Sequence, residues 1–83
     1  MYYVYLLQSD LNNSFYLGST KDLKRRFAEH NKGASIYTKK YLPWKLIYYE
    51  AFLTYALAYD RELALKRRSK SFQELVKRLG LER

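Results

Sequence analysis

The stretch that decides the fold lies near the start of the chain, where YYVYLLQ (residues 2–8) is followed by SDLNNS (residues 9–14) and FYLGS (residues 15–19). The two outer segments are rich in aromatic and branched apolar residues, and the polar segment between them is typical of a turn. This pattern predicts a β-hairpin. If the loop keeps an even register, residues whose numbers sum to an odd value pair across the strands, and Tyr5 and Tyr16 then lie on the same face of the sheet. A β-bulge in the turn would break that pairing.

A basic helix is predicted directly after the hairpin, over residues 21–32. Thr20 is a suitable N-cap, Asp22 lies in the first turn, where the helix dipole favours an anion, and Gly33 is a suitable stop. At about 100° per residue, Leu23 and Phe27 lie on the stripe that faces the core, and Arg26 and His30 border it. A guanidinium and an imidazole are therefore expected beside the core.

The second half of the chain predicts one more strand and two more helices. Residues 34–42 are basic and aromatic without a clear period, which indicates an irregular loop with at most one helical turn, ended by Pro43. Residues 44–49 predict a third strand, whose partner the pattern does not reveal. Residues 54–69 and 72–79 predict a longer and a shorter helix.

Glu62 is predicted to be an inward-facing carboxylate on the longer of these helices. It falls inside the arc of the stripe that faces the core, whereas Asp60 points to the far side. The stripe consists of Tyr55, Ala58, Leu65 and Ser69.

The charge of the chain favours a polyanionic partner. The 83 residues, enough for one domain over 1–83, include 16 Lys and Arg against 8 Asp and Glu, which gives a net charge of +8. A positive net charge of this size indicates affinity for nucleic acid or for an acidic membrane surface, or a charge that serves only to keep the protein soluble.

The cellular setting expected from the sequence is the cytoplasm. The chain has no Cys, which excludes disulfides and thiolate metal sites and fits a reducing compartment. Its apolar start lacks a basic n-region and is too short to span a bilayer, so a buried strand is expected in place of a signal peptide, and no membrane partner.

A few side chains have the chemistry needed to cut a phosphodiester. Hydrolysis needs an activated water, neutralisation of charge on the phosphoryl oxygens and help for the leaving alkoxide. A Tyr phenol is a poor base at neutral pH unless nearby cations lower its pKa. Arg26 is able to hold a phosphate bidentately, and His30 to pass a proton or bind a phosphate oxygen. Glu62 alone does not suffice for Zn²⁺, but Mg²⁺ often takes one or two carboxylates and completes its shell with water and substrate.

Ordered blocks of the chain resemble the GIY-YIG nuclease domain, and in particular the small stand-alone bacterial proteins of that superfamily. The blocks are Tyr3-Val4-Tyr5, Tyr16-Leu17-Gly18 and KDLKRRFAEHN (residues 21–31), followed by Tyr37-Thr38, KLIYYE (residues 45–50), Arg61-Glu62 and Lys66. The first motif has Tyr3 where the family name has Gly, and the second has Leu17 for Ile.

The resemblance implies a fold, an activity and a set of roles. The fold would be α/β in the broad sense, more strictly α+β, with a three-stranded antiparallel sheet flanked by helices. The activity would be metal-dependent endonuclease cleavage, with DNA as the first expectation for the nucleic acid, Mg²⁺ or Mn²⁺ as the cofactor and no small-molecule substrate. Tyr5 would act as general base on water, and Tyr16 would orient phosphate or water. Arg26 would stabilise the transition-state charge, His30 would assist, and Glu62 would bind the metal.

Each of these residues also has a plainer reading. Tyr5 and Tyr16 would serve as ordinary sheet aromatics, since the chain has ten Tyr. Arg26 would be one more basic surface residue and His30 a satisfied structural residue beside the core. Glu62 would form an i,i+4 ion pair with Lys66.

Several basic residues are candidates for contacts with the phosphate backbone, with a solvated cationic face as the alternative. They are Lys39, Lys40, Lys45, Arg67, Arg68 and Lys70. Tyr37, Tyr41 and Trp44 lie between them, where they would stack on unpaired bases, although Trp44 suits the core equally well. The rivals to a nuclease are a non-catalytic nucleic-acid-binding module and an adaptor in a repair complex.

Overall fold

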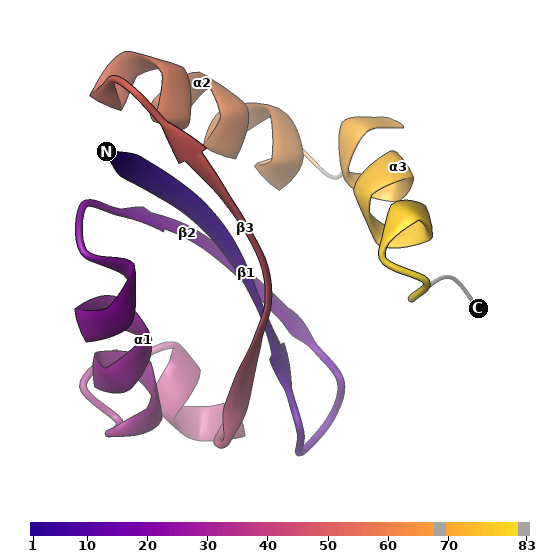
Figure 1. Ribbon diagram of the computed structural model, residues 1–83. Coiled ribbons are helices and arrows are strands. Elements are labelled where there is room, and N and C mark those ends of the chain that lie inside the picture. The colour runs from indigo at the N-terminus through magenta and orange to yellow at the C-terminus, as the bar shows by residue number, and fades with distance from the viewer. Residues whose placement is uncertain (68–69, 82–83) are drawn as a thin grey trace.

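The computed structural model describes residues 1–67 and 70–81, and in it a three-stranded antiparallel sheet of order β2-β1-β3 is flanked by helices (Figure 1). This arrangement confirms the expected α+β fold. In chain order the elements are β1 (Tyr2–Ser9), β2 (Phe15–Thr20), α1 (Leu23–Asn31), the 3₁₀ helix η1 (Thr38–Tyr41), β3 (Trp44–Phe52), α2 (Tyr55–Lys66) and α3 (Lys70–Arg78).

The hairpin has the predicted register. Tyr5 pairs with Gly18 and Leu7 pairs with Tyr16, so paired residue numbers sum to an odd value and the two tyrosines lie on one face. The third strand pairs with the other edge of β1, with a register irregularity between Leu6 and Leu7. It is also three residues longer than predicted, to Phe52, because β1 offers it partners up to Tyr2. β1 is thus the central strand.

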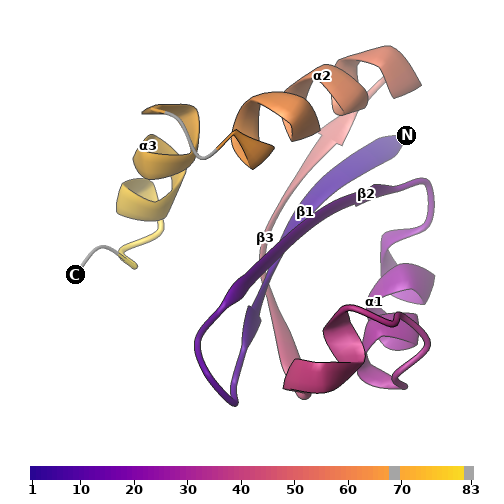
Figure 2. The ribbon, with the colours of Figure 1, turned by 180° about the vertical axis from the view of Figure 1, so that it is seen from behind.

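Two layers of helices cover the two faces of the sheet, because side chains alternate between the faces along each strand (Figures 1 and 2). Val4 and Leu6 of β1 pack with residues of α2 and α3, including Leu65 and Leu75. On the other face, the core is made of Tyr5, Leu7 and Trp44 together with residues of α1 and η1. Burial of each such leucine stabilises the fold by roughly 1.5–3 kcal/mol.

Helix α1 begins two residues later than predicted. Its N-cap is Asp22, whose Oδ1 accepts from the Arg25 amide at 3.1 Å. Thr20, the expected cap, uses its hydroxyl to accept from the Asp22 amide at 3.1 Å instead. The Asp22 carboxylate lies at the positive end of the helix dipole, where a negative charge is favoured. The predicted stop is confirmed, since Gly33 follows the helix with φ of +78°.

The remaining segments follow the predictions with changed limits. One helical turn, η1, lies in the basic loop, and the Leu42–Pro43 peptide after it is cis. Helix α2 begins after its N-cap Thr54 and ends at Lys66, short of the predicted residue 69, and Ser69 lies outside the described residues. Among the helices described, none has the length and apolarity needed to cross a membrane.

Candidate active site on the hairpin

Tyr5 lies at the centre of the candidate site, in the middle strand and only 1% exposed. Its ring lies over Gly18 of the neighbouring strand. A Cβ at position 18 would stand 2.6 Å from the Tyr5 hydroxyl oxygen and 2.8 Å from Cζ, well inside van der Waals contact. Position 18, the last of the Tyr16-Leu17-Gly18 motif, therefore needs a glycine because a larger residue would not fit beside Tyr5.

His30 holds the Tyr5 hydroxyl from helix α1. Its imidazole is fully buried, with Nε2 2.7 Å from the Tyr5 oxygen and Nδ1 2.8 Å from Thr38 Oγ1. Arg26, one turn earlier on α1, lies close enough to the Tyr5 hydroxyl to lower its pKa. With the neutral imidazole protonated on Nδ1, the Tyr5 hydroxyl donates to Nε2 and Nδ1–H donates to Thr38 Oγ1. The donors then run in one direction from Tyr5 through His30 to Thr38.

The electrostatics keep both Tyr5 and His30 neutral at pH 7. Burial, with the nearby Tyr16 second, raises the pKa of Tyr5 to about 12, against the opposite effect of Arg26. Arg26 lowers this pKa, as expected of a nearby cation, but burial outweighs it and the net shift is upward. Burial, with Arg26 second, also lowers the pKa of His30. His30 thus keeps a free lone pair for the Tyr5 proton.

Tyr16 and Arg26 complete this face of the site. The Tyr16 ring centroid lies 4.9 Å from that of His30 and 6.3 Å from that of Tyr5. The Arg26 side chain, 34% exposed, places Nη1 3.1 Å from Glu29 Oε1. Glu29 was not among the predicted site residues, although its i,i+3 spacing from Arg26 could have revealed it.

Glu62 approaches the same hairpin from the opposite layer. It lies on α2, its side chain is 13% exposed, and its Oε1 accepts from Ser19 Oγ at 2.6 Å. Oε2 forms an ion pair with Lys66 Nζ at 2.7 Å, as the plainer reading of the sequence expected. Ser19 directly follows Gly18 on the edge strand, and the charge of Glu62 raises the pKa of Tyr5. The carboxylate is thus near the phenol, but across strand β2 from it.

The structure therefore brings four of the predicted residues into one contacting cluster and places the fifth beside it. We call the cluster and the carboxylate together the hairpin site, which consists of Tyr5, Tyr16, Arg26, His30 and Glu62. Two supporting residues, Ser19 and Thr38, were not predicted as part of it. Their partners are 43 and 8 positions away along the chain, so no local pattern identifies them.

The hairpin site fits a single divalent cation that takes most of its ligands from elsewhere. Within residues 1–67 and 70–81, no group of three or more His, Cys, Asp and Glu side chains could enclose a metal. Glu62 is a hard oxygen donor, and Mg²⁺ commonly accepts one carboxylate together with waters and substrate phosphate. Lys66 would have to give up part of its ion pair with Glu62.

The basic residues predicted to contact nucleic acid fall into two groups on different layers. Lys39 and Lys40 are exposed on η1, on the α1 side of the sheet. Arg67 and Lys70 are exposed where α2 ends and α3 begins. Lys45 forms an ion pair with Asp10 at 3.2 Å, and Arg68 lies outside the described residues.

Of the three aromatics expected to stack on bases, only Tyr37 is well exposed, at 58%. Trp44 is 2% exposed and its Nε1 donates to the Thr38 carbonyl at 2.7 Å. It is therefore a core residue, and its proposed stacking on nucleic acid is wrong. Tyr41 is half-buried against the same core.

Comparison with known proteins agrees with this geometry. The family model described as the GIY-YIG catalytic domain matches residues 1–76. The chain belongs to the GIY-YIG family. This GIY-YIG domain is 40% identical over 73 residues to a UPF0213 protein of Streptococcus pneumoniae serotype 4, covering 87% of this chain and 73% of that one. It is 39% identical over 75 residues to a UPF0213 protein of Streptococcus pyogenes serotype M3, covering 89% and 80%.

A solved structure supports the same family assignment. The solution NMR structure of a UPF0213 protein from Bacillus halodurans matches with a TM-score of 0.58 and 32% identity, over 95% of this chain and 85% of that one. The predicted membership of the GIY-YIG family, in its small stand-alone subgroup, is confirmed. Membership of this family indicates a domain of the nuclease type.

Proposed function

We propose that this protein is a metal-dependent endonuclease that hydrolyses phosphodiester bonds in nucleic acid, with DNA as the first candidate. The observation that carries the proposal is the buried hydrogen bond between the Tyr5 hydroxyl and His30 Nε2, with the guanidinium of Arg26 beside the phenol. A group able to hold phosphate thus lies next to a pair able to pass a proton, and the carboxylate of Glu62 lies across strand β2 from them.

Arg26 is the group that would hold the scissile phosphate. Its guanidinium is partly exposed and faces Glu29 and the Tyr5 hydroxyl. A phosphate would take the place of Glu29 as its anionic partner, through two parallel hydrogen bonds. The developing charge on the phosphoryl oxygens then meets a fixed positive charge in a largely buried setting.

Tyr5 would pass a proton rather than act as a free phenolate. With its pKa at about 12, the phenolate fraction at pH 7 is only roughly one in a hundred thousand. A proton relay through Tyr5 avoids the need to form a free phenolate. Water transfers a proton to the Tyr5 oxygen while Tyr5 transfers its own to His30 Nε2, and the hydroxide forms the new bond to phosphorus as the bond to the leaving oxygen breaks. The proton on His30 returns through Tyr5 to solvent after the product leaves.

Glu62 is the residue that would hold Mg²⁺ or Mn²⁺. A bound cation of this kind neutralises charge on the phosphoryl oxygens and lowers the pKa of water next to it. Ser19 fixes the Glu62 carboxylate through Oε1, so its position is set before any ligand binds. Tyr16, whose ring packs on His30, would hold the imidazole in place and border the phosphate.

One observation favours a second candidate, a non-catalytic nucleic-acid-binding module or adaptor. Both oxygens of Glu62 already have partners in Ser19 and Lys66, which is a stable arrangement without a metal. The fold and the basic surface would then serve binding alone.

A nicking assay separates the two candidates. Supercoiled plasmid, branched DNA and RNA are incubated with Mg²⁺ or Mn²⁺, using wild type, Glu62→Ala, Arg26→Ala and the exposed control Glu74→Ala. We expect cleavage by wild type and by the control, and loss of cleavage in the other two variants. If every protein shifts the substrates in a gel while leaving them intact, the binding module is correct and the nuclease proposal fails.

A further inference from the structure

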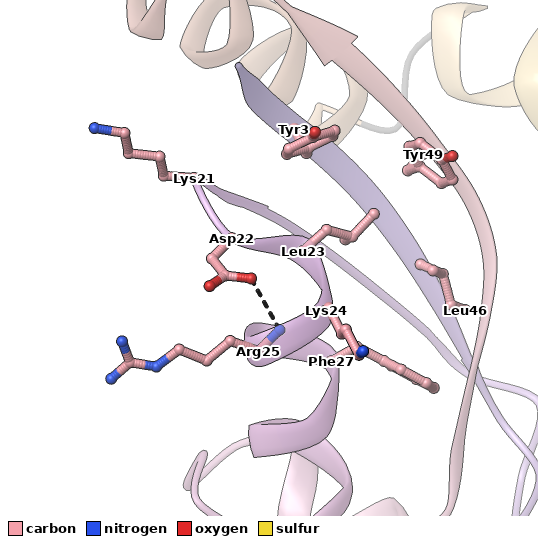
Figure 3. A pocket seen from close by; sticks show the side chains of 9 residues that line it. All are labelled: Tyr3, Lys21, Asp22, Leu23, Lys24, Arg25, Phe27, Leu46 and Tyr49. Atoms are coloured by element: carbon pink, nitrogen blue, oxygen red, sulfur yellow. Dashed lines mark hydrogen bonds between the residues drawn. The ribbon is translucent and has the colours of Figure 1, made fainter.

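Apart from the hairpin site, the α1 face of the sheet has a hollow on the side away from β2. Its volume is about 890 Å³, and it is formed between the start of α1 and strand β3 (Figure 3). We call it the α1–β3 groove. Its floor is aromatic and apolar and consists of Tyr3, Leu23, Phe27, Leu46 and Tyr49. Its rim consists of Lys21, Asp22, Lys24 and Arg25.

The two floor tyrosines present ring surface to the groove. Tyr3 and Tyr49 come from the paired strands β1 and β3, and their ring centroids are 6.0 Å apart in an edge-to-face arrangement. Tyr49 is 54% exposed, which is unusual for an aromatic side chain in the middle of a strand. Figure 3 shows both rings standing beside Leu23 over the strands. Flat aromatic surface of this kind is what stacks on nucleobases.

The rim carries more positive than negative charge. Lys21, Lys24 and Arg25 are exposed, while Asp22 is engaged as the N-cap of α1. Lys24 and Phe27 both line the groove and are labelled in Figure 3. Arg25 already forms an ion pair with Glu29 at 3.2 Å. An apolar peptide would use the floor but would offer no anion to Lys21 and Lys24, whereas the phosphates of a nucleic acid would pair with them.

The groove continues around the start of α1 to the hairpin site. A smaller hollow of about 250 Å³ is lined by Thr20, Lys21, Asp22, Arg25, Arg26 and Glu29. Three of these residues, Lys21, Asp22 and Arg25, also line the α1–β3 groove. A strand whose phosphate rests on Arg26 therefore has a path into the groove past Lys21 and Arg25, with Asp22 and Glu29 engaged in the helix cap and in ion pairs.

We propose that the α1–β3 groove binds unpaired nucleotides next to the bond that is cut, with a base on Tyr49 and Tyr3 and a phosphate at Lys24. The choice of partner rests on the proposed function. In a duplex the base faces are covered by their neighbours and only edges and phosphates are accessible, so stacking on Tyr49 requires an unpaired base. The preferred substrate then carries a single-stranded segment, in DNA or in RNA.

Binding to matched substrates tests this inference without any cleavage. Fluorescence anisotropy in EDTA compares a blunt duplex with the same duplex carrying a short single-stranded extension, in DNA and RNA versions. We expect the extension to increase the affinity of wild type. Tyr49→Ala should reduce affinity for the extended duplex by about 5- to 150-fold, since one base stacked on an aromatic is worth roughly 1–3 kcal/mol. Affinity for the blunt duplex should be unchanged.

The controls separate stacking from a general loss of structure. Tyr49→Phe keeps the ring and should keep the gain, and Tyr55→Ala removes an equally exposed tyrosine of α2 and should also keep it. A 2-aminopurine in the extension should lose fluorescence on binding to wild type and not on binding to Tyr49→Ala. The inference is overturned if wild type gains nothing from the extension, or if Tyr49→Ala gains as much as wild type.

The outcome is independent of whether the protein cuts. If the protein never cleaves but its affinity still increases with the extension in a Tyr49-dependent way, the inference about the groove stands and the nuclease proposal fails. If it cleaves blunt and extended substrates equally and the extension adds no affinity, the nuclease proposal stands and the inference about the groove fails.

Discussion

Gly18 and Tyr5, on neighbouring strands, lie in close contact within the hairpin site. Because a methyl group at position 18 would overlap the Tyr5 hydroxyl and Cζ, the phenol keeps its place against His30 only over a glycine. The glycine of the Tyr16-Leu17-Gly18 motif is thus required by the space that Tyr5 occupies, and not by a special backbone angle.

We predict that Gly18→Ala destabilises the fold by about 1–3 kcal/mol, the usual cost of overpacking a core. Urea denaturation measures the change. Tyr5→Phe removes the nearest overlapping atom, so the double variant Gly18→Ala/Tyr5→Phe should lose less than the sum of the single losses. Additive losses would show that the two residues do not compete for the same space.

His30, the only histidine of the chain, predicts an acid-sensitive stability. Burial and Arg26 lower its pKa in the folded state below the usual 6.5, so the unfolded chain takes up a proton first. The stabilisation is present above pH 6.5 and is lost as the pH falls below that value. We expect the free energy of unfolding to decrease from pH 6.5 toward pH 5 in wild type and to stay nearly level in His30→Gln.

Chemical denaturation across that pH range tests this prediction. Glu29 adds a separate effect at lower pH, since Arg26 lowers its pKa and its contribution disappears only below about pH 4.5. Equal slopes for wild type and His30→Gln between pH 6.5 and 5 would contradict a buried neutral imidazole.

At the scale of elements, the side chain of Asn31 hydrogen-bonds the end of α1 to the start of β3. Asn31 Nδ2 donates to the Trp44 carbonyl at 2.9 Å, and the Trp44 amide donates to Asn31 Oδ1 at 2.8 Å. These two bonds hold the last residue of the helix against the first residue of the strand, and the indole of Trp44 in turn anchors η1 through Thr38. The position of His30 depends on this connection.

We predict that Asn31→Ala costs about 1–3 kcal/mol, because it leaves the backbone donor of a buried residue without its partner. Thermal unfolding measures the loss, and Lys32→Ala, at the exposed next position, serves as the control with little effect. The amide signal of Trp44 should also exchange faster with solvent in Asn31→Ala. A loss no greater than that of Lys32→Ala would assign the connection to apolar packing alone.

At the scale of the whole molecule, edge strand β2 lies between two cationic layers. A hollow of about 190 Å³ at this edge is lined by Tyr16 and Tyr37 on one side and by Lys66 of α2 on the other, with Phe15 and Leu17 between them. A nucleic acid lying along β2 would face Lys39 and Lys40 on one layer and Arg67 and Lys70 on the other.

We predict that both cationic groups contribute to the salt dependence of binding. Removing one cation that pairs with a phosphate should reduce the slope of log K against log salt concentration by roughly 0.9 for duplex DNA. Lys39→Ala/Lys40→Ala and Arg67→Ala/Lys70→Ala should therefore each flatten the slope by up to about 1.8, as a titration series in rising salt would show. Lys77→Ala/Arg78→Ala, at the far end of α3, should leave it unchanged. Equal slopes in all three pairs would mean that neither group binds phosphate.

Several features followed from the sequence because they are local. The hairpin register came from alternation over a few residues, Arg26 and His30 came to one side of α1 by helical period, and Glu62 faced inward for the same reason. The i,i+4 ion pair of Glu62 with Lys66 was equally local. The N-cap was assigned wrongly because Thr20 and Asp22 are both good caps, and only the backbone geometry chooses between them.

Other features depend on residues that are far apart along the chain and meet only in the tertiary structure. The sequence by itself determined the elements, the shared face of Tyr5 and Tyr16 and the likeness to GIY-YIG domains. Only the folded chain decided that β3 pairs with β1, that Ser19 holds Glu62 and that Tyr5 has a pKa of about 12. The physical reason is that pairing, hydrogen bonding across elements and desolvation are set by which surfaces meet, and no short window of sequence contains both surfaces.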